Sequence, residues 1–133
     1  MTTAAEDPQA NEAPPLRPGD VVGRHRVARE VGRGGMCNVY EAVHIDLQKR
    51  VALKLLKPAF AVDATLVERF LREGRAASKV RHRHAVDVFD VGAHGGLAYL
   101  VMEFLEGEDL ARRLRREGSL TPQETADLLL PVM

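Results

Sequence analysis

Residues 31–42 read VGRGGMCNVYEA and place three glycines, Gly32, Gly34 and Gly35, within four positions. Glycine tolerates backbone conformations that other residues avoid, and it lets a ligand approach the main chain closely. Clustered main-chain N–H groups in such a segment form a positively polarised concavity that suits phosphate. The stretch therefore predicts either a phosphate-binding loop or a tight hairpin turn that holds no ligand, and its surroundings decide between them.

The residues after the glycines exclude two well-known phosphate-binding loops. A Walker A loop ends in Gly-Lys-Ser/Thr, and the sequence contains no such triplet. A dinucleotide-binding fingerprint needs a helix directly after the glycines, whereas NVYEAVHI (38–45) has the β-branched and aromatic residues of a strand. What remains is a glycine-rich hairpin. It matches the pattern G-x-G-x-x-G-x-V at each fixed position except the third glycine, where Cys37 stands.

The flanking sequence predicts three strands, a helix, two strands and then further helices. Strand patterns cover 25–31, 38–45, 50–56, 85–92 and 97–105, and helical patterns cover 63–80 and 105–118. A capping-box signal at Thr121, Pro122 and Glu124 starts another helix. Consecutive strands joined by short turns predict a five-stranded antiparallel sheet with one packed helix, an α+β fold. Residues 1–18 predict a disordered tail, with order beginning near Gly19 and Asp20.

Composition narrows the function classes. The chain has 133 residues, enough for about one domain. Lys plus Arg and Asp plus Glu both number 19, so no net charge attracts nucleic acid or an anionic membrane. A single cysteine, and an acidic N-terminus without a signal-peptide pattern, predict a cytoplasmic protein. No apolar run is long enough to span a membrane, so a membrane anchor would have to lie in a segment outside this sequence.

Two charged residues stand where charges are costly. Lys54 lies in RVALKLL (50–56), where Val51, Leu53 and Leu55 alternate with Ala52, Lys54 and Leu56. Glu73 sits at the centre of the helical stripe Leu66–Phe70–Glu73–Ala77–Val80. A lone buried charge costs several kcal/mol, and two opposite charges offset much of that cost by pairing. The sequence predicts a buried Lys54–Glu73 ion pair, and the alternative is that each side chain reaches solvent separately.

In order and spacing, GRGGMCNVYEA, VALK, RFLREGRAASKV and LAYLVMEFLEGEDL resemble the N-terminal lobe of bacterial eukaryotic-like serine/threonine protein kinases. The resemblance runs from about Gly19 to the end of the chain. It implies an ATP-binding lobe over 19–105, followed by the exit from the hinge and the first helices of the C-lobe over 106–133. The parent enzyme would transfer the γ-phosphoryl group of MgATP to serine or threonine of a protein substrate.

The resemblance also assigns roles to residues. Lys54 would contact the α- and β-phosphates, with Glu73 as its partner on helix αC of the family. Met102 falls at the gatekeeper position, and Glu103 and Leu105 fall in the hinge that binds adenine. The complete set implied for nucleotide binding is Val31, Gly32, Arg33, Gly34, Gly35, Met36, Cys37, Asn38, Val39, Ala52, Lys54, Met102, Glu103 and Leu105.

The sequence departs from the family pattern in ways that set further expectations. The Cys37 side chain is expected to crowd the phosphates and weaken nucleotide binding. Gly74, inside the predicted helix, costs about 1 kcal/mol relative to alanine and predicts a helix that is mobile without a partner. Asp90–Val91–Gly92 and His82–Arg83–His84 resemble the D-F-G and H-R-D motifs of the family, but they lie too early in the chain to serve as them.

The catalytic H-R-D and D-F-G segments, which would hold Mg²⁺, are absent from the sequence. Together with the abrupt end after Leu128–Leu130, this predicts a truncated protein or a piece of a longer chain that is inactive by itself. The alternative is a non-catalytic lobe that acts as a protein-interaction module, and a glycine-rich hairpin protein without nucleotide is a third hypothesis. The five scattered histidines do not have zinc-ligand spacing. Arginines 112, 113, 115 and 116 predict a solvated basic helix face, with docking of an acidic partner as the alternative.

Overall fold

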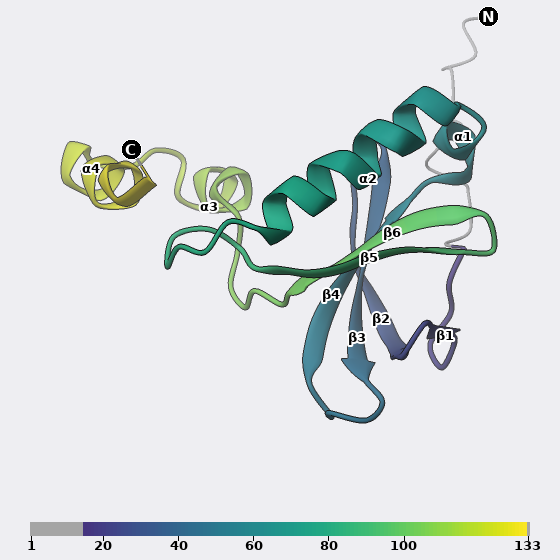
Figure 1. Ribbon diagram of the computed structural model, residues 1–133. Coiled ribbons are helices and arrows are strands. Elements are labelled where there is room, and N and C mark those ends of the chain that lie inside the picture. Colours follow the sequence, from purple (N-terminus) through teal and green to yellow (C-terminus); the bar gives the residue numbers. More distant parts are fainter. Residues whose placement is uncertain (1–14, 133) are drawn as a thin grey trace, which may run out of the picture.

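The computed structural model describes residues 15–132. They form one curled antiparallel sheet with a long helix across it, and two short helices stand apart from the sheet (Figure 1). In chain order the elements are β1 (Val21–Val22), β2 (His25–Arg33), β3 (Cys37–His44), β4 (Arg50–Leu56), α1 (Pro58–Ala61), α2 (Ala64–Ser78), β5 (Val88–His94), β6 (Leu97–Glu103), α3 (Leu110–Glu117), α4 (Pro122–Leu129) and the 3-10 turn η1 (Leu130–Val132).

The predicted α+β fold, with a helix packed on an antiparallel sheet, is confirmed. The strand order is β1-β2-β3-β4-β6-β5, and every neighbouring pair is antiparallel. The sheet has six strands because Val21 and Val22 pair with the start of β2 and add a short strand at one edge. The fourth predicted strand begins three residues later than expected, at Val88. In Figure 1 the sheet is strongly twisted, and α2 lies across β5 and β6.

The two faces of the sheet carry different side chains, as the alternation in β4 predicts. Val51, Leu53 and Leu55 belong to a closed apolar core, whereas Leu56 belongs to a second cluster under α1 and α2. Leu53 and Leu55 are each only 1% exposed. The closed core therefore fixes the sheet from one side and leaves the Lys54 side of β4 for the helix and for the site.

The ordered chain begins earlier than the sequence predicted. Residues 1–14 of the predicted tail lie outside the described residues, but Leu16 is 4% exposed and packs in the closed core. Just after it, the main-chain N–H of Arg17 donates to Asp20 Oδ2 over 2.8 Å and closes a turn. One large apolar side chain next to a core is enough to order this end, so the prediction that disorder extends to residue 18 is wrong at Leu16.

Helix α2 begins where the sequence predicts but faces the sheet with different residues. Asp63 is its N-cap and accepts hydrogen bonds from the main-chain N–H groups of Thr65 and Leu66. Its packed side chains are Val67, Phe70 and Leu71, and its only buried residue is Gly74. The predicted stripe through Glu73 and Val80 is wrong, because both are exposed and Val80 lies beyond the end of the helix.

Gly74 is the point at which α2 comes closest to the sheet. A Cβ atom at this position would lie 2.3 Å from Leu100 Cδ2 and 2.9 Å from Val91 Cγ1. These distances are far below van der Waals contact, so the absent side chain is what lets the helix settle on β5 and β6. The expectation that α2 is mobile without a partner stays a prediction, and it rests on helix propensity alone.

Two short helices follow β6 and are set apart from the sheet in Figure 1. α3 starts at Leu110, later than the predicted 105, because Asp109 supplies the N-cap by accepting from Arg112 N over 2.7 Å. The predicted capping box of α4 is present, with Thr121 and Glu124 each bonded to the other's main-chain N–H. Within residues 15–132, the helices are too short and too polar to cross a membrane.

Candidate functional site

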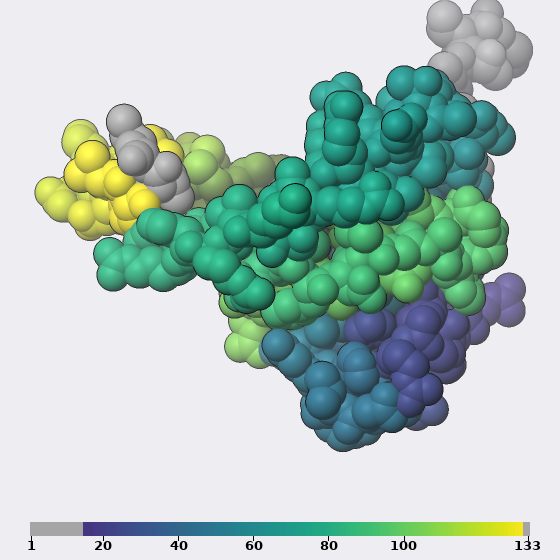
Figure 2. Space-filling view, viewed as in Figure 1, coloured from purple at the N-terminus to yellow at the C-terminus, as the bar shows by residue number. Residues whose placement is uncertain are grey.

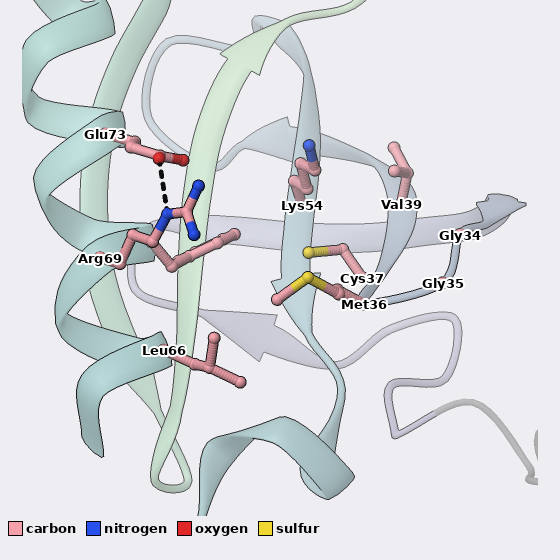
Figure 3. Close-up of a pocket in the computed structure, with 10 residues that line it drawn as sticks. Gly34, Gly35, Met36, Cys37, Val39, Lys54, Leu66, Arg69 and Glu73 are labelled. Atoms are coloured by element: carbon pink, nitrogen blue, oxygen red, sulfur yellow. Dashed lines mark hydrogen bonds and ion pairs between the residues drawn. The ribbon is translucent and has the colours of Figure 1, made fainter. Parts of the chain in front are cut away.

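A cavity of about 530 Å³ lies between the glycine hairpin and α2 (Figure 3). Its walls come from three elements that are distant in sequence: the β2–β3 turn, the middle of β4 and the first half of α2. The lining residues are Gly34, Gly35, Met36, Cys37, Val39, Lys54, Leu66, Arg69, Phe70 and Glu73. The fold thus brings the glycine loop, the strand lysine and the helix glutamate to one place.

The glycine loop is a tight hairpin, and some of its main-chain groups already form hydrogen bonds within the protein. Gly34 N donates to Cys37 O over 2.7 Å, and Gly32 pairs with Val39 in the β2–β3 register. A Cβ atom on Gly34 would lie 3.2 Å from Cys37 O, so this glycine allows the close turn. A Cβ atom on Gly35 would meet nothing within 4 Å, so the main chain here is open to a ligand.

Lys54 extends from the centre of β4 into the cavity (Figure 3). Its neighbours across the sheet are Val39 on β3 and Leu100 on β6, so it stands between two strands that hold its backbone in place. The side chain is half-buried, and it forms no ion pair with a carboxylate among residues 15–132. Its ammonium group is therefore a positive charge directed at the space beneath the glycine loop.

Glu73 pairs with Arg69 and not with Lys54 (Figure 3). Arg69 Nε and Glu73 Oε1 are 3.0 Å apart, one helical turn from each other, and both side chains are about two-thirds exposed (65% and 64%). The predicted buried Lys54–Glu73 ion pair is wrong for this structure, because Glu73 lies beside the packed face of α2 and remains hydrated. An exposed pair of this spacing contributes only about 0.3–0.5 kcal/mol.

Comparisons with known proteins identify the family. A sequence description of the protein kinase domain matches residues 25–133. The chain belongs to the protein kinase family. Serine/threonine-protein kinase PrkC of Bacillus subtilis is 37% identical over 109 residues, covering 82% of this chain and 17% of PrkC. PknA of Mycobacterium tuberculosis is 40% identical over 112 residues, covering 80% of this chain and 26% of PknA.

Solved structures agree with the sequence comparison. The kinase domain of M. tuberculosis PknI is 28% identical with a TM-score of 0.79, covering 88% of this chain and 47% of that structure. The fold of residues 15–132 is thus that of a kinase N-lobe with the start of the helical part, as the sequence predicted. The chain spans about a sixth of the length of PrkC and about a quarter of that of PknA.

Cys37, the departure from the kinase glycine pattern, is packed into the protein. Its side chain is 7% exposed and clusters with Leu56 and Ala98, and the α2 side chains Phe70 and Leu71 pack against this cluster. Burial raises the pKa of the thiol, and the charges of Lys54 and Lys57 act in the opposite direction. The expectation that this side chain crowds the phosphate region fits poorly with a thiol held against the helix, although the residue does line the cavity wall.

Most of the residues expected to surround adenine lie outside the lining of the described cavity, and Val39 is the exception among them. Ala52 and Met102 are register partners in β4 and β6, on the same face of the sheet as Lys54. Glu103 N donates to Asp87 O over 2.9 Å, and Leu105 is 60% exposed. The structure therefore gathers the phosphate side of the predicted site in one cavity, and the adenine side continues along the sheet toward β6.

Four more predicted residues also lie apart from the cavity lining, and Gly32, which pairs with Val39, is one of them. Val31 occupies an irregularity of the β2–β3 register between Glu30 and Gly32, and Arg33 forms an ion pair with Glu30. Asn38 is 6% exposed and alternates with Cys37 and Val39, which line the cavity, so its side chain lies on the core face of β3.

The sequence interpretation missed the cavity-lining role of three α2 residues, Leu66, Arg69 and Phe70. Leu66 and Phe70 were assigned to the packed stripe, but their place beside the glycine loop depends on how α2 lies across β5 and β6. The spacing of Arg69 and Glu73 is a signal that the sequence did contain, because opposite charges four residues apart on a helix pair with each other. No group of three or more His, Cys, Asp or Glu side chains among residues 15–132 is placed to hold a metal ion.

Proposed function

We propose that this chain is the ATP-binding part of a serine/threonine protein kinase that acts in the cytoplasm. ATP lies beneath the hairpin of residues 31–39, with its adenine against Val39, Ala52 and Met102. The longer enzyme transfers the γ-phosphoryl group to a serine or threonine hydroxyl of a protein. PrkC and PknA, whose similarity covers most of this chain, are both named serine/threonine-protein kinases, and this supports phosphoryl transfer as the reaction class.

The observation that carries the proposal is the shared cavity of the glycine loop, Lys54 and Glu73. Phosphoryl transfer depends on positioning and on electrostatic stabilisation of phosphate oxygens, so an ammonium group that shares a cavity with the main chain of a glycine loop has the required chemistry. Lys54 has no carboxylate partner among the described residues, which leaves its charge available to the α- and β-phosphates.

Nucleotide binding would change the partner of Glu73. Glu73 and Lys54 already line the same cavity, and the Arg69–Glu73 pair that competes with them is exposed and weak. Phosphates held on Lys54 would fix its ammonium group, and a small movement of α2 would let Glu73 orient that group from the other side. The kinase resemblance assigns this orienting role to Glu73.

The remaining chemistry needs residues that are not in this sequence. H-R-D and D-F-G segments, which position the substrate hydroxyl and hold Mg²⁺ in kinases, do not occur in the 133 residues. Residues 15–132 do not supply a cluster of carboxylates that would hold Mg²⁺, so we derive no step through the metal. We infer that the 133-residue chain binds nucleotide but does not transfer its phosphoryl group.

Calorimetric titration of the 133-residue chain with a non-hydrolysable ATP analogue tests the proposal. Wild-type protein should bind, and Lys54→Met should lower the affinity by about tenfold or more because a charged contact to phosphate is lost. Lys49→Met is the matched control, since Lys49 lies over the Phe89 ring, outside the cavity, and should leave the affinity unchanged. No binding by the wild type, or equal binding by Lys54→Met, would contradict the nucleotide site.

A second candidate function rests on the exposed leucines of the last helices. Leu110 and Leu114 on α3 and Leu128–Leu130 on α4 and η1 are each between 38% and 66% exposed. A non-catalytic lobe that binds a partner through these side chains would show association without any need for nucleotide. Binding of the ATP analogue that depends on Lys54 favours the kinase proposal over this alternative.

A further inference from the structure

The solvent face of α2 and the loop after it form a continuous row of cations. The row consists of Arg72, Arg75, Lys79, Arg81 and Arg83, all of which are exposed, and we refer to it as the basic ridge. In Figure 2 the teal atoms of α2 and of the loop after it form an uncovered band across this side of the molecule. The basic ridge is therefore accessible along its whole length.

Helix geometry places the first three of these cations together. Arg72, Arg75 and Lys79 are spaced by three and four residues, so they lie on one face of the helix end. That face is opposite Phe70 and Gly74, which pack on the sheet. The helix is held close to β5 and β6 at Gly74, so the cations stand on a support whose position is fixed.

The basic ridge is a group of cations without ion-pair partners. None of its five side chains forms an ion pair within the described part of the chain, and residues 74–86 contain no Asp or Glu. Arg112 and Arg115 on α3 also form no ion pair among residues 15–132, but six surface arginines outside α2 are paired with acids. These pairs are Arg24–Asp46, Arg29–Glu41, Arg33–Glu30, Arg50–Glu106, Arg113–Glu117 and Arg116–Glu108.

Unneutralised cations on one fixed surface repel each other, and they attract a ligand of opposite charge. We propose that the basic ridge docks an acidic segment of another protein. Arginine favours carboxylates because its planar guanidinium group binds both oxygens at once. The stretch from Arg72 to Lys79 is about 10 Å long at 1.5 Å per residue, which three or four residues of an extended acidic peptide would match.

The charge on the rest of the chain favours a short acidic segment over a long polyanion. Outside residues 74–86, the described part of the chain contains 15 basic and 16 acidic side chains, so its positive charge is concentrated in the segment 74–86. A nucleic acid or an anionic membrane that extended beyond the basic ridge would meet no further net positive charge. A peptide that ends within the ridge would not.

The proposed docking surface is separate from the proposed nucleotide site. None of its five residues lines the cavity beneath the glycine loop. Its charges therefore can be reversed without touching Lys54 or Glu73. Failure of peptide binding with intact nucleotide binding would count against the basic ridge alone.

Fluorescence anisotropy of a labelled hexaglutamate peptide with the 133-residue chain tests the proposal. Saturable binding is expected at low salt, and it should weaken as salt screens the charges. Arg75→Glu combined with Lys79→Glu should lower the affinity by about tenfold or more. Arg81→Glu combined with Arg83→Glu should lower the peptide affinity by a similar factor. Both residues lie outside α2, so this variant still tests the proposal if the first variant folds poorly.

The matched control is Arg112→Glu combined with Arg115→Glu on α3, which changes the net charge by the same amount. It should lower the peptide affinity by less than about twofold. Equal loss in this control, or the absence of saturable binding by the wild type, would overturn the proposal. Binding of oligothymidylate or phosphatidylserine vesicles as tight as that of hexaglutamate would also overturn it, because the surface would then attract any polyanion.

Discussion

The two faces of strand β4 show how one short sequence serves both stability and function. Val51, Leu53 and Leu55 are 1–2% exposed and are enclosed by apolar side chains from most of the sheet. On the other face, Lys54 is half-buried and borders a cavity of about 530 Å³. The first face is buried among apolar side chains, while the second carries a charge beside a cavity. A site for a charged ligand can therefore exist beside a closed core because strand alternation separates them.

The largest expected effect is on the closed face. Leu53→Ala removes a side chain that is 1% exposed, and it should lower the free energy of unfolding by about 3 kcal/mol. Lys54→Met, one residue away, should change that free energy by less than about 1 kcal/mol while impairing nucleotide binding. Urea unfolding of both variants measures the contrast. A similar loss of stability in the two would remove the distinction between the faces.

The next effect concerns the contact between α2 and the sheet. Gly74→Ala improves helix propensity by about 1 kcal/mol, but its Cβ would lie 2.3 Å from Leu100 Cδ2. Overpacking costs about 1–3 kcal/mol, so the net result should be destabilisation. Thermal unfolding measures it. The exposed Ala76→Gly change is a control that should cost about 1 kcal/mol through propensity alone. A stabilised Gly74→Ala protein would show that α2 is not held at this point.

Cys37 lies where the glycine loop meets the packed side of α2. Cys37→Gly, which restores the kinase pattern, removes a buried side chain and should lower the free energy of unfolding by about 1–2 kcal/mol. The affinity for an ATP analogue should change by less than about threefold, because the thiol packs against the helix cluster. Calorimetry and urea unfolding measure the two quantities. A large gain in affinity would support the view that the thiol crowds the phosphates.

The smallest expected effect is on the surface of α2. Arg69→Gln removes the partner of Glu73 and should lower the stability by only about 0.3–0.5 kcal/mol, because both side chains are exposed. If Arg69 competes with Lys54 for Glu73, the affinity for the ATP analogue should rise slightly in this variant. Glu73→Gln is the paired measurement and should abolish that rise. Equal affinities in wild type, Arg69→Gln and the double variant would show that the pair has no influence on the site.

Much of the fold was predictable because its signals are local. The boundaries of β4 match the prediction at Arg50 and Leu56, since alternating apolar residues end at Pro58. The caps at Asp63 and Thr121 were also visible, because each depends on side chains within three residues of the helix start. The place of Leu16 was not predictable, since a single apolar residue in a polar segment carries no periodic signal.

The sequence by itself determined the strands, the hairpin, the helix and the presence of a lysine and a glutamate that could meet. Only the tertiary structure decided which side of α2 faces the sheet. Helical periodicity allowed a stripe through Glu73, but close contact of Gly74 with Leu100 and Val91 turned Glu73 outward to Arg69. Periodicity defines the spacing of a face and not its direction, and that direction depends on the steric fit of residues that are distant in sequence.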